Sequence, residues 1–286
     1  TETPDELFKM FFNGEILGDI ASVLRYRVNY IPDTGYDDPT KEKIRELVEK
    51  RNHMTVATLM LGNDSGFDSA VIEHQRNWYE TMPDIRLLTR YQSPMMYDES
   101  TRRTMVFPAT YFDTMALMDH FARVGNFYDP FAGAYARWTG YIEDTMNYPT
   151  ETAETLQALY ESRINVVMKD FMPGAYLSDQ LMNTQKTSDQ TELNNEFLIS
   201  NMLYDLVELI HRNHFKFNET AHVRLFHNAV NDAINSKYKE YSASLSVEVQ
   251  RLGTVGRAKS ANKIIVTIDM RDINRYTNVE LYLVDE

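Results

Sequence analysis

The chain has 286 residues, of which 43% are hydrophobic and 25% are charged, and it contains no cysteine. This length allows one large domain or two of ordinary size, and the apolar fraction suffices for a core, which argues against full disorder. The formal net charge of −13 argues against a general nucleic-acid-binding protein, which needs excess lysine and arginine to release counterions from phosphates. Without cysteine, disulfide scaffolds, thiolate zinc sites, iron–sulfur clusters and cysteine nucleophiles are excluded.

Neither a membrane span nor a secretion signal is expected. No stretch of the sequence approaches the roughly 20 apolar residues that a membrane-spanning helix needs. The first residues, Thr1–Glu6, lack the basic start and the apolar run of a signal peptide. We therefore expect a protein that is made in a cytoplasm and does not contact a membrane.

The first half of the sequence predicts helices separated by turns. Apolar spacing predicts two short helices within residues 3–24, and turn residues mark a loop over 31–39. Residues 40–51 predict a charged surface helix whose Ile44, Leu47 and Val48 point inward. Further helices are expected over 71–79, 111–124 and 130–146. Enrichment in methionine, tyrosine and phenylalanine from Tyr91 to Tyr148 indicates core or interface packing.

The second half predicts three longer helices, over residues 150–172, 193–213 and 218–240. Between the first two lies the segment 178–192, which is polar and almost without apolar anchors. Such a composition is typical of a mobile loop, or of a segment that orders only against a partner.

After Tyr241 the apolar period changes from 3.6 to 2, which is typical of strands. Alternation predicts strands over residues 243–250, 263–270 and 278–285, joined as an antiparallel meander. The fold class is therefore predicted as α+β: a mainly α-helical body over 1–241, followed by a C-terminal three-stranded antiparallel β-meander over 242–286. A long basic hairpin loop, 253–263, would join the first two strands.

The sharpest enzymatic hypothesis is a di-iron site, because helical bundles hold such sites with Glu-x-x-His pairs. The sequence has two matches: Glu208 with His211, and Glu219 with His222. On a helix, Glu208 lies opposite the apolar stripe and faces solvent, and Glu219 occupies a first turn, where an acid is expected for dipole reasons alone.

A zinc site among the histidines is also unfavoured, although His211, His214, His222 and His227 lie close in sequence. No cysteine or well-placed carboxylate completes a tetrahedral set, and we expect His227 to be a hydrogen-bonded core histidine. The sequence also lacks a Gly-x-Ser-x-Gly nucleophile turn, a phosphate-binding loop and a calcium loop. We therefore expect no catalytic, cofactor-binding or metal-binding residues, no cofactor, and no enzyme activity.

Two features indicate interactions with other proteins. The loop 253–263 is basic in an acidic chain: it is either a solvated loop or a projection that grips an acidic neighbour or touches nucleic acid locally. The last predicted strand would offer an open edge to another chain, which permits assembly by strand addition. The candidate interaction residues are Arg257, Lys259, Lys263, Val279, Leu281 and Leu283.

The helices within 150–240 followed by the three predicted strands resemble the neck and head-completion (head–tail connector) proteins of tailed bacteriophages. This resemblance implies a structural virion protein that is made in the host cytoplasm and forms a homo-oligomeric ring. Its partners would be copies of itself and portal or tail components, and DNA would only pass through the channel, past an acidic wall that repels phosphates. The alternatives are another capsid, baseplate or scaffold subunit, a helical-bundle metal–carboxylate enzyme, or an adaptor module.

Overall fold

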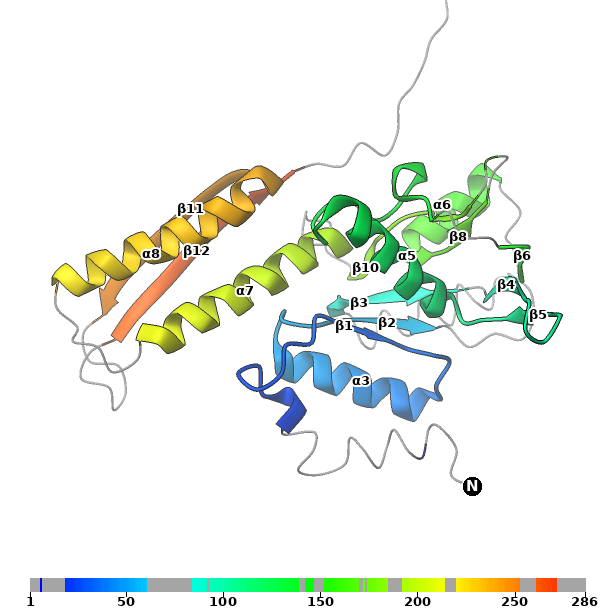
Figure 1. Cartoon of the computed structure of the whole chain (residues 1–286), viewed down its shortest axis with the longest axis horizontal. Coiled ribbons are helices and arrows are strands. Elements are labelled where there is room, and N and C mark those ends of the chain that lie inside the picture. The colour runs from blue at the N-terminus through cyan, green and yellow to red at the C-terminus, as the bar shows by residue number, and fades with distance from the viewer. Residues whose placement is uncertain are drawn as a thin grey trace, which may run out of the picture.

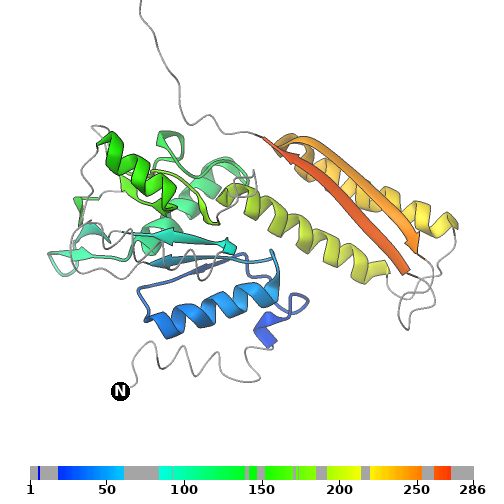
Figure 2. The ribbon, with the colours of Figure 1, turned by 180° about the vertical axis from the view of Figure 1, so that it is seen from behind.

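The computed structural model describes residues 6, 19–60, 84–91, 93–138, 142–146, 152–169, 172, 174–184, 192–213, 220–252 and 261–271. Figure 1 shows two parts: a body that contains most of the short strands, and a lobe that consists of a helix and a long hairpin. Figure 2 shows the same arrangement from behind, with one long helix, α7, running from the body into the lobe.

The body is organised around a mixed sheet. Its strands are β1 (Tyr30–Pro32), β2 (Val56–Met60), β3 (Asp84–Arg90), β7 (Ile164–Asn165) and β10 (Met182–Asn183). The order is β1-β2-β3-β10, with β7 also paired to β3; β10 is antiparallel to β3 and the other pairings are parallel. Helix α3 (Asp38–Arg51) covers one face of this sheet and α5 (Ala109–Val124) covers the other. Parallel strands covered on both faces are near-continuous apolar runs; β2 is apolar except for Thr58, and each of its residues is buried.

Shorter elements complete the body. A second, antiparallel sheet has the order β5-β4-β6, and β8 pairs with β9. The bounds of these elements are β4 (Ser93–Asp98), β5 (Arg103–Val106), η1 (Ala134–Ala136), β6 (Asp144–Met146), α6 (Ala153–Glu161), β8 (Val167–Met168) and β9 (Tyr176–Leu177).

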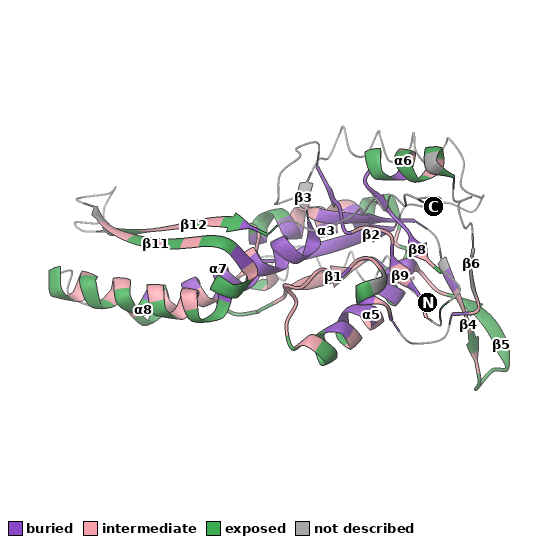
Figure 3. Cartoon of the chain, turned by 90° about the horizontal axis from the view of Figure 1, so that it is seen from above, coloured by how far each residue is buried: buried purple, intermediate pink, exposed green. Residues whose placement is uncertain are grey.

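Helix α7 (Leu193–Asn213) connects the body with the lobe. Its first half is buried in the body and is purple in Figure 3. Its last turns are mostly exposed. The lobe contains α8 (Thr220–Tyr238), η3 (Lys239–Tyr241), β11 (Ser242–Leu252) and β12 (Ala261–Met270). One apolar cluster joins α7, α8 and the hairpin; its buried members are Leu198, Met202, Leu206, Val230, Ile234, Tyr238 and Met270. None of the helices in these described ranges is long and apolar enough to cross a bilayer.

The predicted fold class is wrong. The body is built on a largely parallel sheet and is not mainly helical, and the described part of the C-terminal region is a two-stranded hairpin packed on α8. The sheet escaped prediction because β2, which is buried on both faces, shows no period-2 alternation in sequence. The third predicted strand, 278–285, lies outside the described residues.

Several local predictions are also wrong. Residues 130–146 contain the short helix η1 and strand β6 in place of one helix, and the helix predicted over 150–172 ends at Glu161. At Arg163 the backbone is left-handed, with φ of 57°, and the chain continues as β7 and β8. The polar segment 178–192 is not a loose loop where it is described, because Gln180, Met182 and Asn183 are buried.

Four predicted helices are confirmed as α3, α5, α7 and α8. Ile44, Leu47 and Val48 of α3 are fully or almost fully buried, as their spacing indicates. The two short helices expected within 3–24 lie mostly outside the described residues, and the one expected over 71–79 lies entirely outside them.

The start of α3 allows a direct test of helix capping. Asp37 is the N-cap, and its Oδ1 accepts a hydrogen bond of 2.9 Å from the backbone N–H of Thr40. Replacing Asp37 with alanine removes this side-chain acceptor and leaves the Thr40 N–H with the backbone carbonyl of residue 37, 3.0 Å away. The loss should lower the free energy of unfolding by about 1 kcal/mol. Urea denaturation measures the change. Asp37→Asn, which keeps an acceptor oxygen, should retain most of the stability, and an equal loss in both variants would contradict the capping role.

Candidate functional site

The β11–β12 hairpin presents open strand edges. The two strands pair over their whole length, from Ser242 opposite Met270 to Leu252 opposite Ala261. Alternate side chains pack toward α8 as part of the lobe cluster: Leu245, Val247, Ile264, Val266 and Ile268. Within the described ranges this sheet has two strands only, so each strand has one edge whose backbone N–H and C=O groups face no other strand. Such an edge is a template for pairing with another chain.

The opposite face of the hairpin is polar. Ser246, Glu248, Thr267 and Asp269 are exposed there, so the lobe is a two-layer unit with one apolar and one solvated face. Among the predicted interaction residues, only Lys263 is described: it is exposed on β12, opposite Gln250. Arg257, Lys259, Val279, Leu281 and Leu283 lie outside the described residues, so their predicted role stays a prediction.

Helix α5 carries apolar side chains on its outer face. Tyr111 and Met118, seven residues apart, lie on one side of the helix and are 43% and 58% exposed. Phe121 and Tyr135, which follows α5 in the chain, are also exposed. The buried side of the same helix holds Phe112, Ala116 and Leu117 together with the polar residues Thr110, Asp113 and His120. Exposed apolar side chains that gather on one face are typical of a surface that another protein covers.

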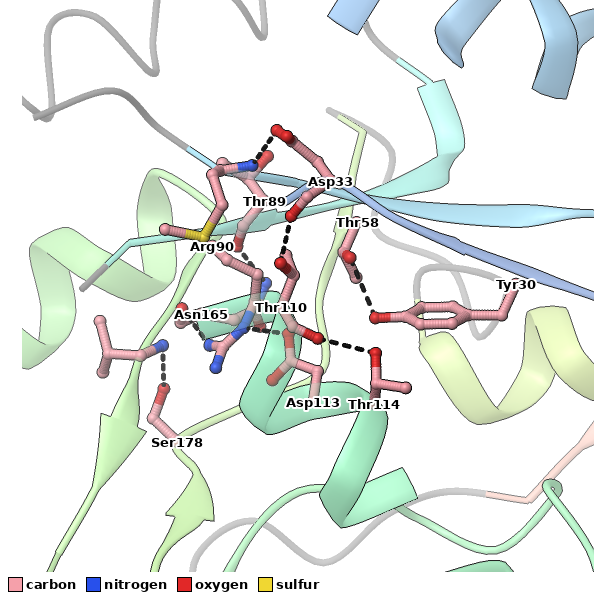
Figure 4. Close-up of polar contacts among 12 residues, drawn as sticks. Tyr30, Asp33, Thr58, Thr89, Arg90, Thr110, Asp113, Thr114, Asn165 and Ser178 are labelled. Carbon is pink, nitrogen blue, oxygen red and sulfur yellow. Dashed lines mark hydrogen bonds and ion pairs between the residues drawn. The ribbon is translucent and has the colours of Figure 1, made fainter. Parts of the chain in front are cut away.

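A buried ion pair helps to fix α5 on the sheet. Nε of Arg90 on β3 donates to Oδ2 of Asp113 at 2.6 Å, and the side chains are 0% and 3% exposed. The Arg90 guanidinium also donates to the carbonyl of Asn165, whose side-chain amide donates to the carbonyl of Thr89 (Figure 4). The same amide donates to the carbonyl of Leu181. Burial raises the pKa of Asp113, and the Arg90 charge opposes that rise. This cluster therefore ties α5 to β3, to β7 and to the start of β10, the two strands that pair along the same edge of β3.

A second polar contact fixes the start of α5. Asp33, which follows β1, is fully buried, and its carboxylate accepts hydrogen bonds from the backbone N–H groups of Gly35, Tyr36 and Met60, each at 2.8 Å. Thr110 Oγ1 donates to the Asp33 carbonyl, as Figure 4 shows. Burial raises the pKa of Asp33. The three N–H donors and Lys41, whose Nζ lies 4.0 Å from Oδ2 of Asp33, lower this pKa but do not outweigh burial. All these partners are internal, so the arrangement positions elements and presents no reactive group to solvent.

Besides α7, residues 126–138 hold the lobe against the body; we call them the bridging loop. Asn126 Nδ2 donates to Tyr241 Oη at 3.2 Å, and the Tyr128 ring meets those of Tyr238 and Tyr241 at centroid distances of 5.5 and 5.1 Å. On the body side, the N–H of Phe131 donates to Gln180 Oε1 at 2.7 Å. The bridging loop thus contacts both parts of the molecule.

The residues considered for a metal site do not converge where they are described. Glu208 forms an exposed ion pair with Arg212, as its predicted solvent-facing position requires, and His211 is exposed. His227 is part-buried, with Nε2 3.2 Å from the carbonyl oxygen of Val247, as predicted. In the described ranges no group of three or more acidic or histidine side chains is placed to hold a metal ion.

Comparisons with known proteins identify the fold. No protein-family model and no curated sequence matches the chain. A chain in the 6-fold symmetrised cryo-EM structure of the anti-feeding prophage baseplate matches with a TM-score of 0.73 and 10% identity, over 99% of this chain and 75% of that one. A chain of the PVC sheath complex, an extracellular contractile injection system in the contracted state, matches with a TM-score of 0.71 and 10% identity, over 93% and 74%.

A crystal structure of a sheath tail protein from Desulfitobacterium hafniense matches with a TM-score of 0.56 and 11% identity, over 88% of this chain and 59% of that one. At such identities the matches show a shared fold. The chain therefore has a fold found in sheath and baseplate structures of contractile, phage-tail-like particles.

Proposed function

We propose that the chain is a structural subunit of a contractile, phage-tail-like particle, in which it forms the sheath by packing against copies of itself. The observation that carries this proposal is the fold match over 99% of the chain to a baseplate structure and over 93% to a contracted sheath. The proposed role is architectural and involves no catalysis, in keeping with the use of Asp33 and of the Arg90–Asp113 pair to position elements of the fold.

The sheath role replaces the neck or head–tail connector role expected from sequence. Both are structural roles in phage-like particles, but the solved structures named above are sheath and baseplate assemblies, which favours a tail position. The partners proposed are therefore copies of this chain and other tail components. The particle, assembled from protein made in the producing cell, is the proposed location.

The hairpin edges are the proposed sites of subunit contact. Strand addition to β11 or β12 would satisfy backbone groups that face no other strand within the described ranges. The alternating segment with Val279, Leu281 and Leu283 has a suitable pattern for a third strand, which a neighbouring copy would supply. The basic residues Arg257, Lys259 and Lys263 would then lie near the hairpin tip and contact an acidic neighbouring copy, since the chain carries a net charge of −13.

The apolar outer face of α5 is a second proposed contact with a neighbouring copy. Met118→Asp places a charge at a side chain that is 58% exposed, so the fold should tolerate it while burial against another subunit should not. We expect at least a tenfold loss of sedimenting assembly, measured by analytical ultracentrifugation, with unchanged circular dichroism. Met118→Leu should assemble as the wild type does. If Met118→Asp assembles as the wild type does, the outer face of α5 is not a contact between subunits.

Native mass spectrometry tests the function. The proposal predicts oligomers of this chain, alone or together with co-expressed tail proteins. Co-expression is included because a subunit of this kind can require a partner on which to assemble. Monomers under every condition, including co-expression, would contradict the proposal. The same spectra report bound metal, so a stoichiometric iron or zinc ion would instead favour the metal–carboxylate enzyme considered from sequence.

A further inference from the structure

His120 is a buried histidine without a hydrogen-bond partner. Its side chain lies on the inner side of α5 and is 1% exposed, and neither Nδ1 nor Nε2 has a partner within the part of the chain that the structure describes. Its neighbours are aromatic: the Phe131 ring at 6.0 Å and the Tyr135 ring at 6.3 Å between centroids, both edge-on. Both rings belong to the bridging loop.

A neutral imidazole fits this setting and a charged one does not. Burial is the main cause that lowers the pKa of His120, and Arg123, one turn further along α5, lowers it too. The carboxylates of Asp119 on α5 and Asp129 on the bridging loop raise the pKa of His120, but by less than burial and Arg123 lower it. The unfolded chain therefore takes up this proton before the folded chain does, so the folded arrangement loses stability as the pH falls below about 6.5, the ordinary value for histidine.

The contact of His120 with the bridging loop extends to the lobe. The backbone N–H of Phe131 donates a hydrogen bond to Gln180 Oε1, and Nε2 of Gln180 donates to Asn194 Oδ1 at 2.5 Å. Asn194 in turn donates to the carbonyl of Tyr128 at 3.1 Å, and Tyr128 packs on the lobe residues Tyr238 and Tyr241. A displacement of Phe131 would therefore act on the same short segment that holds the lobe.

We propose that His120 is an acid-sensitive latch: its protonation expels the imidazole from the aromatic pocket, loosens the bridging loop and frees the lobe to move relative to the body. The expelled imidazolium would turn toward solvent and toward the carboxylates of Asp119 and Asp129, away from Arg123. The latch does not depend on the proposed sheath role, because all its groups lie within one chain.

Hydrogen exchange of the full chain at pH 7.5 and pH 5.5, normalised to the intrinsic rate at each pH, tests the latch. In the wild type, peptides from 126–138 should lose protection at least tenfold at the lower pH, while α3 peptides keep theirs. His120→Phe fills the pocket without a titratable group, so protection of the bridging loop should be the same at both pH values. His211→Phe, an exposed histidine replaced at the end of α7, should behave as the wild type does.

Three results would overturn the latch. The first is equal protection of the bridging loop in the wild type at both pH values. The second is an equal loss in His120→Phe, which would reflect the general fall in net charge toward the isoelectric point near 5.0. The third is loss of protection in α3 together with the loop, which would indicate global unfolding. If His120→Phe does not fold, His120→Leu gives the same comparison.

Discussion

Replacing Asp113 with alanine should lower the free energy of unfolding by about 3–5 kcal/mol, because it leaves the Arg90 charge buried without its counterion. Both side chains are almost completely buried, and the Nε–Oδ2 distance is 2.6 Å. The Arg90 guanidinium keeps its hydrogen bond to the Asn165 carbonyl but loses the carboxylate that balances its charge. Urea denaturation followed by circular dichroism measures the loss.

Two control variants test whether the loss of stability comes from the buried ion pair and not simply from removing an acidic side chain. Asp119→Ala, on the same helix, breaks the exposed pair with Arg123 and should cost less than about 1 kcal/mol. The double variant Arg90→Met with Asp113→Leu removes both charges and should recover most of the stability, since apolar replacement of a buried pair is often neutral or stabilising. A loss below about 1 kcal/mol in Asp113→Ala would show that the pair does not hold α5 to the sheet.

Removing residues 278–286 should abolish assembly and leave the described fold intact. The proposed third strand, with Val279, Leu281 and Leu283, would pair with a hairpin edge, and its loss removes a row of backbone hydrogen bonds between subunits. The sedimenting fraction should fall at least tenfold, while the helical circular dichroism stays unchanged. Sedimentation and far-ultraviolet spectra of the same sample give both values.

A point variant tests whether the segment acts by pairing as a strand. Leu281→Pro removes one backbone N–H and should reproduce the deletion if that strand is paired, whereas Glu280→Gln should assemble normally. A deletion variant that still assembles would contradict the strand-addition proposal. Loss of helical signal in the deletion would mean that the segment belongs to the core of its own chain.

The sequence was informative wherever an element has one buried and one exposed face. Helices α3 and α8, the second half of α7, and strands β11 and β12 each pack on one side, so their apolar residues recur with the period of the element. Strand β2 is buried at all five positions and has no such period. In the region predicted as the 150–172 helix, Ile164 and Val167 continue the helical spacing of Leu156 and Tyr160, although they lie on strands β7 and β8.

The candidate site was predictable only in its hairpin. Alternation over 243–250 and 263–270 indicated the two paired strands, and their open edges follow from the pairing. The Arg90–Asp113 pair joins a strand and a helix that are 23 positions apart in sequence, and no spacing rule connects such residues. His120 reads in sequence as an ordinary helix position beside Asp119, because its burial depends on the packing of Phe131 and Tyr135.

Electron cryomicroscopy of the purified chain, alone and co-expressed with its tail neighbours, tests the central claim most directly. The proposed function predicts rings or hollow tubes in which the β11–β12 hairpin of each copy shares a sheet with a strand of another. Single copies under both conditions, or assemblies in which both hairpin edges face solvent, would contradict it.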